Sequence, residues 1–306
     1  MKRVVVLGML MAVGAASITV AAFQQPSDKP KVLEATKIRD TLYVLRGDGN
    51  DGGNTAVFIT ATGVIVVDTK KMGWGQPIID TIKTLTDKPV TTIINTHTHY
   101  DHVNGNAEFP PTVDVITHEN TKAYMEQGNP VFGVAPESQE KIVKDDSKRV
   151  RRTFGQTWTI GSGKDQVDLR YFGRAHTGGD AFVIFPALRV MHVGDTFPTR
   201  TLPIMDRNNG GTGVGYSSTI AKAAAVKDVD TIINGHNATT TTPSDMRLFS
   251  EFVADFVKFV QDAKKAGKTV DDVVGSWKTP GKYTGYVEAN AARVKGDVQV
   301  IWDETK

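Results

Sequence analysis

Three histidines and one aspartate lie within six residues of one another: His97, His99, Asp101 and His102. They follow a β-branched run, 90–94, of the kind typical of a buried strand. In an extended chain, residues i and i+2 point to the same side, so His97 and His99 can present two imidazoles to one ion. Neutral imidazole together with carboxylate suits an ion such as zinc and leaves a coordination position open for water.

Three further residues of these chemical types follow later β-rich runs: His176, Asp195 and His236. Glycine or small residues flank each of them, so each side chain can emerge at the same edge of a sheet. With the cluster they make seven ligands, enough for two ions that share one carboxylate. We interpret His118 and His192 as packing or hydrogen-bonding residues. Asp68, at a strand end, either supports a ligand histidine from outside or caps a turn.

Composition narrows the chemistry further. The 306 residues include no cysteine, which excludes a disulfide framework, a thiolate nucleophile and a cysteine-ligated metal. Any metal must therefore be held by His, Asp or Glu. The formal charge is only +2, which argues against a protein built mainly to bind nucleic acid. We expect a small molecule as its substrate.

The first 22 residues have the pattern of a secretory signal peptide. A basic start, Met1-Lys2-Arg3, precedes an apolar stretch, 4–13, and a small-residue cleavage site at Ala21-Ala22. The alternative is an uncleaved membrane anchor, but the apolar stretch is short and polar residues interrupt the segment that follows it. We therefore expect a periplasmic or secreted protein with no stable membrane insertion after cleavage. Its formal charge falls to zero because Lys2 and Arg3 are lost.

Residues 23–31 are predicted to be a disordered lead-in and residues 32–306 a single α/β domain. Two βα-rich halves, separated by a polar insert at 128–152, suggest a two-sheet sandwich flanked by helices. Strands are expected at 42–45, 56–60, 64–68, 90–94, 113–117, 167–172, 181–185, 190–193, 229–233 and, at the end of the chain, 298–302. Helices are expected at 76–85, 119–127 and 217–226, in a long amphipathic segment at 246–259, and in two short pieces after residue 269. The loops 47–53, 129–147 and 197–215 are the expected sources of substrate contacts.

The His-x-His-x-Asp-His spacing at 97–102 resembles the signature of the metallo-β-lactamase superfamily. The resemblance runs from Gly53-Asn54-Thr55 through the turn at 175–180 to Gly235-His236. It implies a four-layer αββα sandwich with its active site along one edge of the sheets. It further implies that one metal is held by His97, His99 and His176, a second by Asp101, His102 and His236, and that Asp195 bridges them.

The residues and the resemblance together predict an exported hydrolase with two Zn²⁺ ions per chain. A metal-bridging hydroxide would attack an ester, lactone, thioester, phosphoester or amide-type bond, and Asp101 would orient the hydroxide or relay its proton. One alternative is a zinc β-lactamase, although β-lactamases usually have Cys or Ser where this chain has Asp195. A second alternative is a mono-iron sulfur dioxygenase of the same fold, which can share the motif.

Two other classes fit less well. The di-iron redox type has Glu where this chain has His99, and it normally needs a flavin domain for which this length leaves no room. A non-catalytic binder is expected to have lost one or more ligands, whereas this chain retains the complete set.

Overall fold

The computed structural model describes residues 31–49, 51–141 and 144–306. The predicted signal peptide at 1–22 and the lead-in up to residue 30 lie outside the described residues. Within the described part of the chain, none of the helices combines the length and the apolar character needed to span a bilayer.

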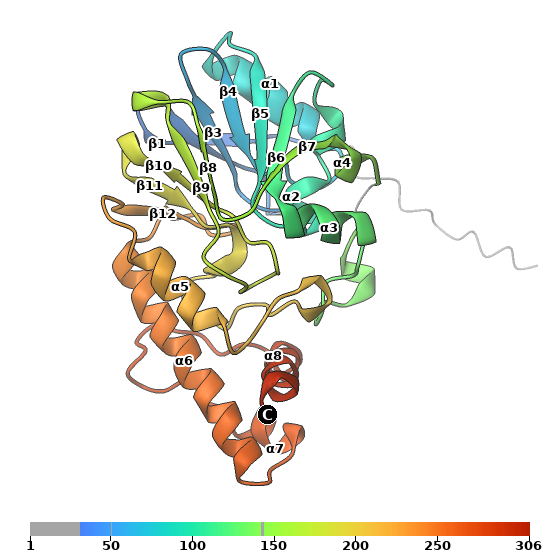
Figure 1. The fold of residues 1–306 in the computed structure, drawn as a ribbon, viewed down its shortest axis with the longest axis vertical. Coiled ribbons are helices and arrows are strands. Elements are labelled where there is room, and N and C mark those ends of the chain that lie inside the picture. The colour runs from blue at the N-terminus through green and yellow to red at the C-terminus, as the bar shows by residue number, and fades with distance from the viewer. Residues whose placement is uncertain (1–30, 50, 142–143) are drawn as a thin grey trace, which may run out of the picture. The chain divides into compact units, whose positions relative to one another are not determined.

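Two β-sheets form the centre of the fold (Figure 1). The first sheet has its strands in chain order: β1 (Glu34–Arg39), β2 (Leu42–Arg46), β3 (Thr55–Ile59), β4 (Val64–Val67), β5 (Val90–Asn95), β6 (Asp114–His118) and β7 (Val150–Phe154). The second has the order β12 (Thr231–Ile233), β11 (Val190–His192), β10 (Phe182–Phe185), β9 (Val167–Arg170) and β8 (Thr157–Ile160). The strands nearest the site, β4 with β5 and β11 with β12, pair in parallel.

Helices cover the outer faces of both sheets. In chain order they are α1 (Gly75–Leu85), α2 (Tyr100–Val103), α3 (Glu119–Gln127), α4 (Lys144–Arg149), α5 (Tyr216–Ala224), α6 (Pro243–Lys265), α7 (Val270–Ser276) and α8 (Ala291–Glu304). Figure 1 shows α1 beside the first sheet, and α5 and the long α6 below the second, with α7 and α8 at the far end of α6.

Alternating side chains of the strands produce the layers. On β3, Phe58 points between the sheets and packs on Phe185 of β10 at a ring-centroid distance of 5.1 Å, while its neighbour Val57 faces α1. The outer face of the second sheet packs on α5, α6 and α8. Each fully buried Val, Leu, Ile, Phe or Met contributes about 1.5–3 kcal/mol to folding. The order helix, sheet, sheet, helix confirms the predicted αββα sandwich.

Helix α6 begins with a capping box between Thr242 and Asp245, with Pro243 at its first position. Its apolar positions Met246, Phe249, Phe252 and Phe256 are all fully buried, as are Val253 and Val260. The predicted amphipathic helix is therefore confirmed, and its apolar face forms core.

The predicted final strand at 298–302 is wrong, because these residues belong to α8. Asn290 caps this helix by accepting a hydrogen bond from the Arg293 backbone N–H. Val294, Val298 and Ile301 are spaced by four and three residues and are buried in the same cluster as the face of α6. The β-branched composition favours a strand locally, but packing against α6 requires a helix. The sequence pattern also misses strands β1, β7 and β8, since their exposed polar positions hide the apolar alternation.

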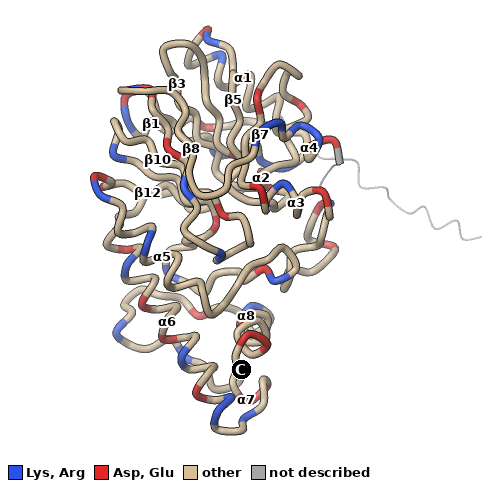
Figure 2. Tube along the Cα trace, in the orientation of Figure 1, with Lys and Arg blue, Asp and Glu red and all other residues tan. Residues whose placement is uncertain are grey.

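Charged side chains of both signs are interspersed along the described chain, for example on α6 (Figure 2). Several pair within one helix, such as Lys258 with Asp262 at 2.6 Å.

Candidate metal centre

The candidate ligands gather where parallel strands end. Asp68 directly follows β4, and His97 and His99 follow β5, while Asp195 follows β11 and His236 follows β12. The carboxyl ends of parallel strands meet at the same edge of each sheet, and the packing of the two sheets brings these two edges together. Asp101 and His102 lie on α2, a single helical turn, and not on an open loop.

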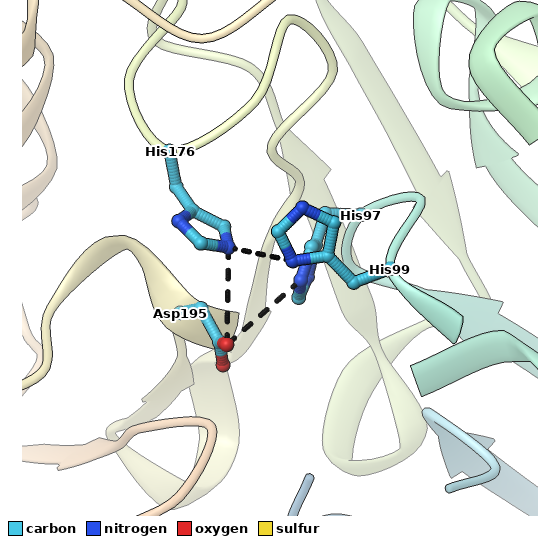
Figure 3. Close-up of side chains that lie close together, drawn as sticks. All are labelled: His97, His99, His176 and Asp195. Atoms are coloured by element: carbon cyan, nitrogen blue, oxygen red, sulfur yellow. Dashed lines mark hydrogen bonds and ion pairs between the residues drawn. The ribbon is translucent and has the colours of Figure 1, made fainter. Parts of the chain in front are cut away.

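The first ligand group consists of His97, His99, His176 and Asp195, whose ligand atoms all lie within 4.8 Å of one another (Figure 3). His176 Nε2 lies 3.0 Å from His99 Nδ1. Asp195 Oδ2 lies 3.9 Å from His97 Nε2 and 3.8 Å from His176 Nε2. The three imidazoles are buried, and 13% of the Asp195 side chain is exposed.

The second group consists of Asp101, His102 and His236. His236 Nε2 lies 3.3 Å from His102 Nε2 and 3.4 Å from Asp101 Oδ2. Asp195 contacts this group as well, since its Oδ2 lies 3.1 Å from His236 Nε2 and its Oδ1 lies 3.3 Å from His102 Nε2. Asp195 is thus the carboxylate between the two groups, as a bridging ligand must be. The seven residues together are called the metal centre below.

Two polar atoms of the metal centre support a bound cation. His97 Nε2 is buried and has no hydrogen-bond partner among the described residues, and Asp195 Oδ1 has only the ion-pair contact of 3.3 Å with His102 Nε2. A buried polar atom without a partner costs about 1–3 kcal/mol, so such atoms usually mark a missing ion or water. All seven donors are nitrogen or carboxylate oxygen, a set that suits zinc.

Groups outside the metal centre orient its imidazoles. Asp68 Oδ2 lies 2.7 Å from His102 Nδ1, and Asp206 Oδ2 lies 2.8 Å from His99 Nε2. The Ile204 carbonyl lies 2.8 Å from His176 Nδ1. Such contacts fix the tautomer and leave the opposite ring nitrogen for a metal.

Of the two roles left open for Asp68, the contact with His102 is the one observed. Its other oxygen accepts a hydrogen bond of 2.8 Å from the Thr96 backbone N–H, which joins β4 to the chain that bears His97. The sequence offered no signal for Asp206, because it lies 107 residues from His99.

The pKa values of two histidines of the metal centre, His97 and His102, are shifted in opposite directions. Burial, together with the neighbouring His102 and His99, holds the pKa of His97 well below its usual value. Burial would also lower the pKa of His102, but Asp195, Asp101 and Asp68 raise that pKa well above the usual value. The carboxylates therefore create a negative field around buried imidazoles, which favours a bound cation.

Two glycines allow the close packing of these residues. A Cβ on Gly235 would lie 1.7 Å from Asp195 Oδ1, and a Cβ on Gly53 would lie 2.2 Å from His102 Cε1. Buried Lys70 holds the Gly53 segment, since its Nζ donates to the Gly53 carbonyl at 2.7 Å and to Asp51 Oδ2 at 2.5 Å. The loop thus positions His102.

A cavity of about 300 Å³ opens beside the metal centre. Metal-centre residues form one side of it, and Val131, Val134, Phe197, Ile204 and Arg293 are among the others that line it. The predicted contact loops 129–147 and 197–215 both contribute. The loop 47–53 contributes no lining residue in its described part, so its expected role in direct substrate contact is not observed.

The two remaining histidines have structural roles, as predicted. His118 caps α3 by accepting a hydrogen bond from the Asn120 backbone N–H at 3.1 Å, and its ring stacks on Tyr171. His192 is fully buried in β11 and accepts from the Gly194 backbone N–H at 3.1 Å.

Comparisons with known proteins bear on this geometry. The family model described as the metallo-beta-lactamase superfamily matches residues 48–236. A protein named metallo-beta-lactamase type 2, from Elizabethkingia meningoseptica, is 27% identical over 182 residues, which is 56% of this chain. The match spans 63% of that relative's own length.

Two solved structures share the fold. A metallo-beta-lactamase from Pontibacter korlensis superposes with a TM-score of 0.58 at 18% identity, covering 72% of this chain and 99% of that one. The inverting sec-alkylsulfatase Pisa1 from Pseudomonas sp. superposes with a TM-score of 0.70 at 13% identity, covering 87% of this chain and 50% of that one. The superposition on Pisa1 therefore includes more of this chain than the superposition on the Pontibacter metallo-beta-lactamase does, 87% against 72%.

Proposed function

The chain belongs to the metallo-β-lactamase superfamily, and we propose that it is a dinuclear zinc hydrolase. Its substrate would be a small molecule with an ester, lactone, thioester, phosphoester or amide-type bond. We also propose that it is exported, a point that depends on the composition of residues 1–22 alone.

The observation that carries the proposal is the position of Asp195. One carboxylate oxygen lies within 4 Å of His97 and His176, and the carboxylate also lies within 3.3 Å of His102 and His236. A site for one metal needs no carboxylate between two ligand groups. The arrangement therefore favours two metals, with His97, His99 and His176 holding one, Asp101, His102 and His236 the other, and Asp195 shared.

When bound, zinc supplies Lewis acidity and makes a nucleophilic hydroxide available at neutral pH. The chain itself orients the reactants. Asp101 lies in the cavity lining with 15% of its side chain exposed, so its free oxygen can accept the proton of an attacking water. Phe197, Ile204 and Val131 give the cavity an apolar part of its lining.

Hydrolysis of β-lactams is the second candidate, because the Elizabethkingia relative bears the name of that activity. Asp195 stands where β-lactamases usually have Cys or Ser, which favours the broader hydrolase class. The mono-iron dioxygenase alternative is less favoured, since the second ligand group would have no role in it.

Metal content and turnover test this function together. Mature protein purified with zinc should bind about two zinc ions per chain by elemental analysis. It should hydrolyse at least one of a cephalosporin, a lactone, a thioester, a phosphodiester and an aryl sulfate. A strong chelator should abolish that activity and zinc should restore it.

Other outcomes would overturn the proposal. One iron per chain with oxygen uptake would favour the dioxygenase. Two bound zinc ions without turnover of any compound in the panel would argue against the hydrolase assignment for these bond classes.

A further inference from the structure

The cavity beside the metal centre is bounded on another side by a residue from the end of the chain. Arg293 lies in the first turn of α8, almost 60 residues beyond the last residue matched by the family model. It lines the same cavity as His99, His176, Asp195 and His236. A cation and the metal ligands thus border one space of about 300 Å³.

Arg293 is the only lysine or arginine among the described residues that line this cavity. Its side chain is half-buried, and none of the described carboxylates lies within 4 Å of its guanidinium. Arg207 and Arg174 differ in this respect, since Arg207 contacts Asp303 at 2.7 Å and Arg174 donates to two backbone carbonyls. A partly desolvated guanidinium that lacks an anionic partner is a recognition site for an oxyanion.

The nearest acid along the helix does not neutralise Arg293. Asp297 lies one turn further on, is fully buried, and accepts a hydrogen bond of 3.1 Å from the Met205 backbone N–H. Burial raises the pKa of Asp297 to about 8, although Arg293 and the Met205 N–H act to lower it. No ion pair joins Asp297 to Arg293 among the described residues, so the guanidinium of Arg293 remains available to a ligand.

Helix α8 holds Arg293 in a fixed position relative to the cavity. Near the middle of the helix, Asp297 contacts Met205, the residue after the cavity-lining Ile204. At its end, Glu304 Oε2 accepts hydrogen bonds of 2.9 Å from Thr212 Oγ1 and from the backbone N–H groups of Gly213 and Val214. Two points of α8 are therefore bonded to the loop that carries Phe197 and Ile204.

From this arrangement we propose that Arg293 binds an oxyanion group of the substrate, such as a carboxylate, remote from the bond that is cleaved. The substrate is then a compact organic anion whose reactive bond faces the metal centre and whose charged end faces α8. Its apolar middle packs on Val131, Val134 and Phe197. A volume near 300 Å³ is at the lower end for ligand cavities, which limits the substrate to a small molecule. The inference rests on the proposed hydrolase function for the identity of the reacting end.

Binding of an inert probe tests the anion site without catalysis. Glutarate and its neutral analogue glutaramide are titrated calorimetrically into the zinc-loaded protein. Wild type should bind glutarate and bind glutaramide at least tenfold more weakly. Arg293→Ala should weaken glutarate binding by about tenfold to a hundredfold, the range for loss of a charge-assisted hydrogen-bonding partner. The affinity of Arg293→Lys for glutarate should lie between those of wild type and Arg293→Ala.

Lys295→Ala provides the matched control. It removes the same charge from the same helix, but Lys295 is exposed and pairs with Asp271 at 3.0 Å, away from the cavity. It should leave glutarate binding unchanged. Zinc content and thermal unfolding of all three variants should match wild type, which shows that each has folded and retains its metals.

A matched pair of esters measures the consequence for turnover. Mono-p-nitrophenyl glutarate carries a remote carboxylate, and p-nitrophenyl butyrate does not. Arg293→Ala should lower kcat/KM about tenfold to a hundredfold for the first ester and less than threefold for the second.

Equal glutarate affinity in wild type and Arg293→Ala would overturn the proposal, because the anion would then bind the metals alone. Undetectable glutarate binding to wild type would overturn it as well. Failure to hydrolyse either ester, with Arg293-dependent glutarate binding intact, would instead count against an ester hydrolase and leave the anion site standing.

Discussion

The metal centre and the C-terminal helices α6–α8 hold their side chains in place by different physical means. In the metal centre, buried polar atoms are fixed by directed contacts, such as that between His102 Nδ1 and Asp68 Oδ2 at 2.7 Å. In the helices, apolar rings are fixed by close packing, such as Phe252 on Tyr283 at a centroid distance of 5.1 Å. The first region lies within the part matched by the family model, and the second follows it in the chain.

Because of this difference, we expect the metal centre to determine metal binding and rate, and helices α6–α8 to determine stability and substrate choice. Directed polar contacts tolerate little displacement, so changes in the metal centre should alter metal binding and rate. Packed rings tolerate substitution at a cost in stability. Changes in the helices should therefore alter stability or substrate choice and leave metal affinity intact. The predictions below test this separation, from the largest expected effect on the metal centre to the smallest.

Asp195→Ala should have the largest effect, because it removes a carboxylate that contacts two histidines of the first ligand group and two of the second. We expect the loss of at least one zinc per chain by elemental analysis, and a fall in kcat of about a thousandfold or more because the remaining metal and its ligands are left misaligned.

The control for Asp195→Ala is Asp271→Asn, which removes an exposed carboxylate on α7. It should retain two zinc ions and full rate. If Asp195→Ala behaves like this control, Asp195 is not the shared ligand.

Asp68→Asn should have a smaller effect, since it changes no ligand. The amide oxygen can still accept the hydrogen bond from the Thr96 backbone, but the negative charge beside His102 Nδ1 is lost. Substitution of such outer partners typically costs about 10- to 100-fold in metal affinity or activity. Competition with a zinc indicator should detect a weakened second site while the first keeps its affinity. Equal weakening of both sites would contradict the assignment of Asp68 to His102.

The ligands of this centre can be predicted from the sequence because their positions follow from local rules. Strands alternate their side chains and parallel strand ends share an edge, so these two rules place His97 and His99 at the edge of one sheet and Asp195 and His236 at the edge of the other. The packing of the two sheets then brings the four residues together. The metal-binding roles of these residues stay predictions until an ion is measured.

Features that depend on tertiary contacts are not accessible in this way. The bond from Asp206 to His99 joins residues 107 positions apart, and no local pattern marks it. The run 298–302 has the composition of a strand, and only its packing against α6 makes it helical. The error has a consequence for function, because a strand at the end of the chain would not place Arg293 beside the cavity.

Phe252→Ala should change stability but not the metal centre. Phe252 is fully buried among Trp277, Tyr283 and Tyr286, and truncation of such a ring costs about 3–5 kcal/mol of unfolding free energy. Urea unfolding should show this loss. Zinc affinity should remain within about twofold of wild type, since the polar contacts described for the metal centre involve no residue of α6. Phe252→Leu, a milder change, keeps the test possible if the alanine variant does not fold. Weaker zinc binding in the leucine variant would contradict the separation of the two regions.

Asp297→Asn should have the smallest effect on the metal centre and a distinct effect on the pH dependence of stability. Burial raises the pKa of Asp297 to about 8, well above its usual value near 4. The folded state therefore holds a proton that the unfolded state releases between these values. The stability associated with this proton is fully present below about pH 4 and is lost as the pH rises toward 8, at up to about 1.4 kcal/mol per pH unit.

The asparagine of the variant keeps the oxygen that accepts from the Met205 N–H but does not titrate. Unfolding free energies of wild type and variant, measured from pH 5 to pH 8, should thus diverge in favour of the variant as pH rises. Ionisation of the metal ligands affects both proteins equally, so parallel curves would mean that Asp297 is charged in the folded protein and that Arg293 is already neutralised by it.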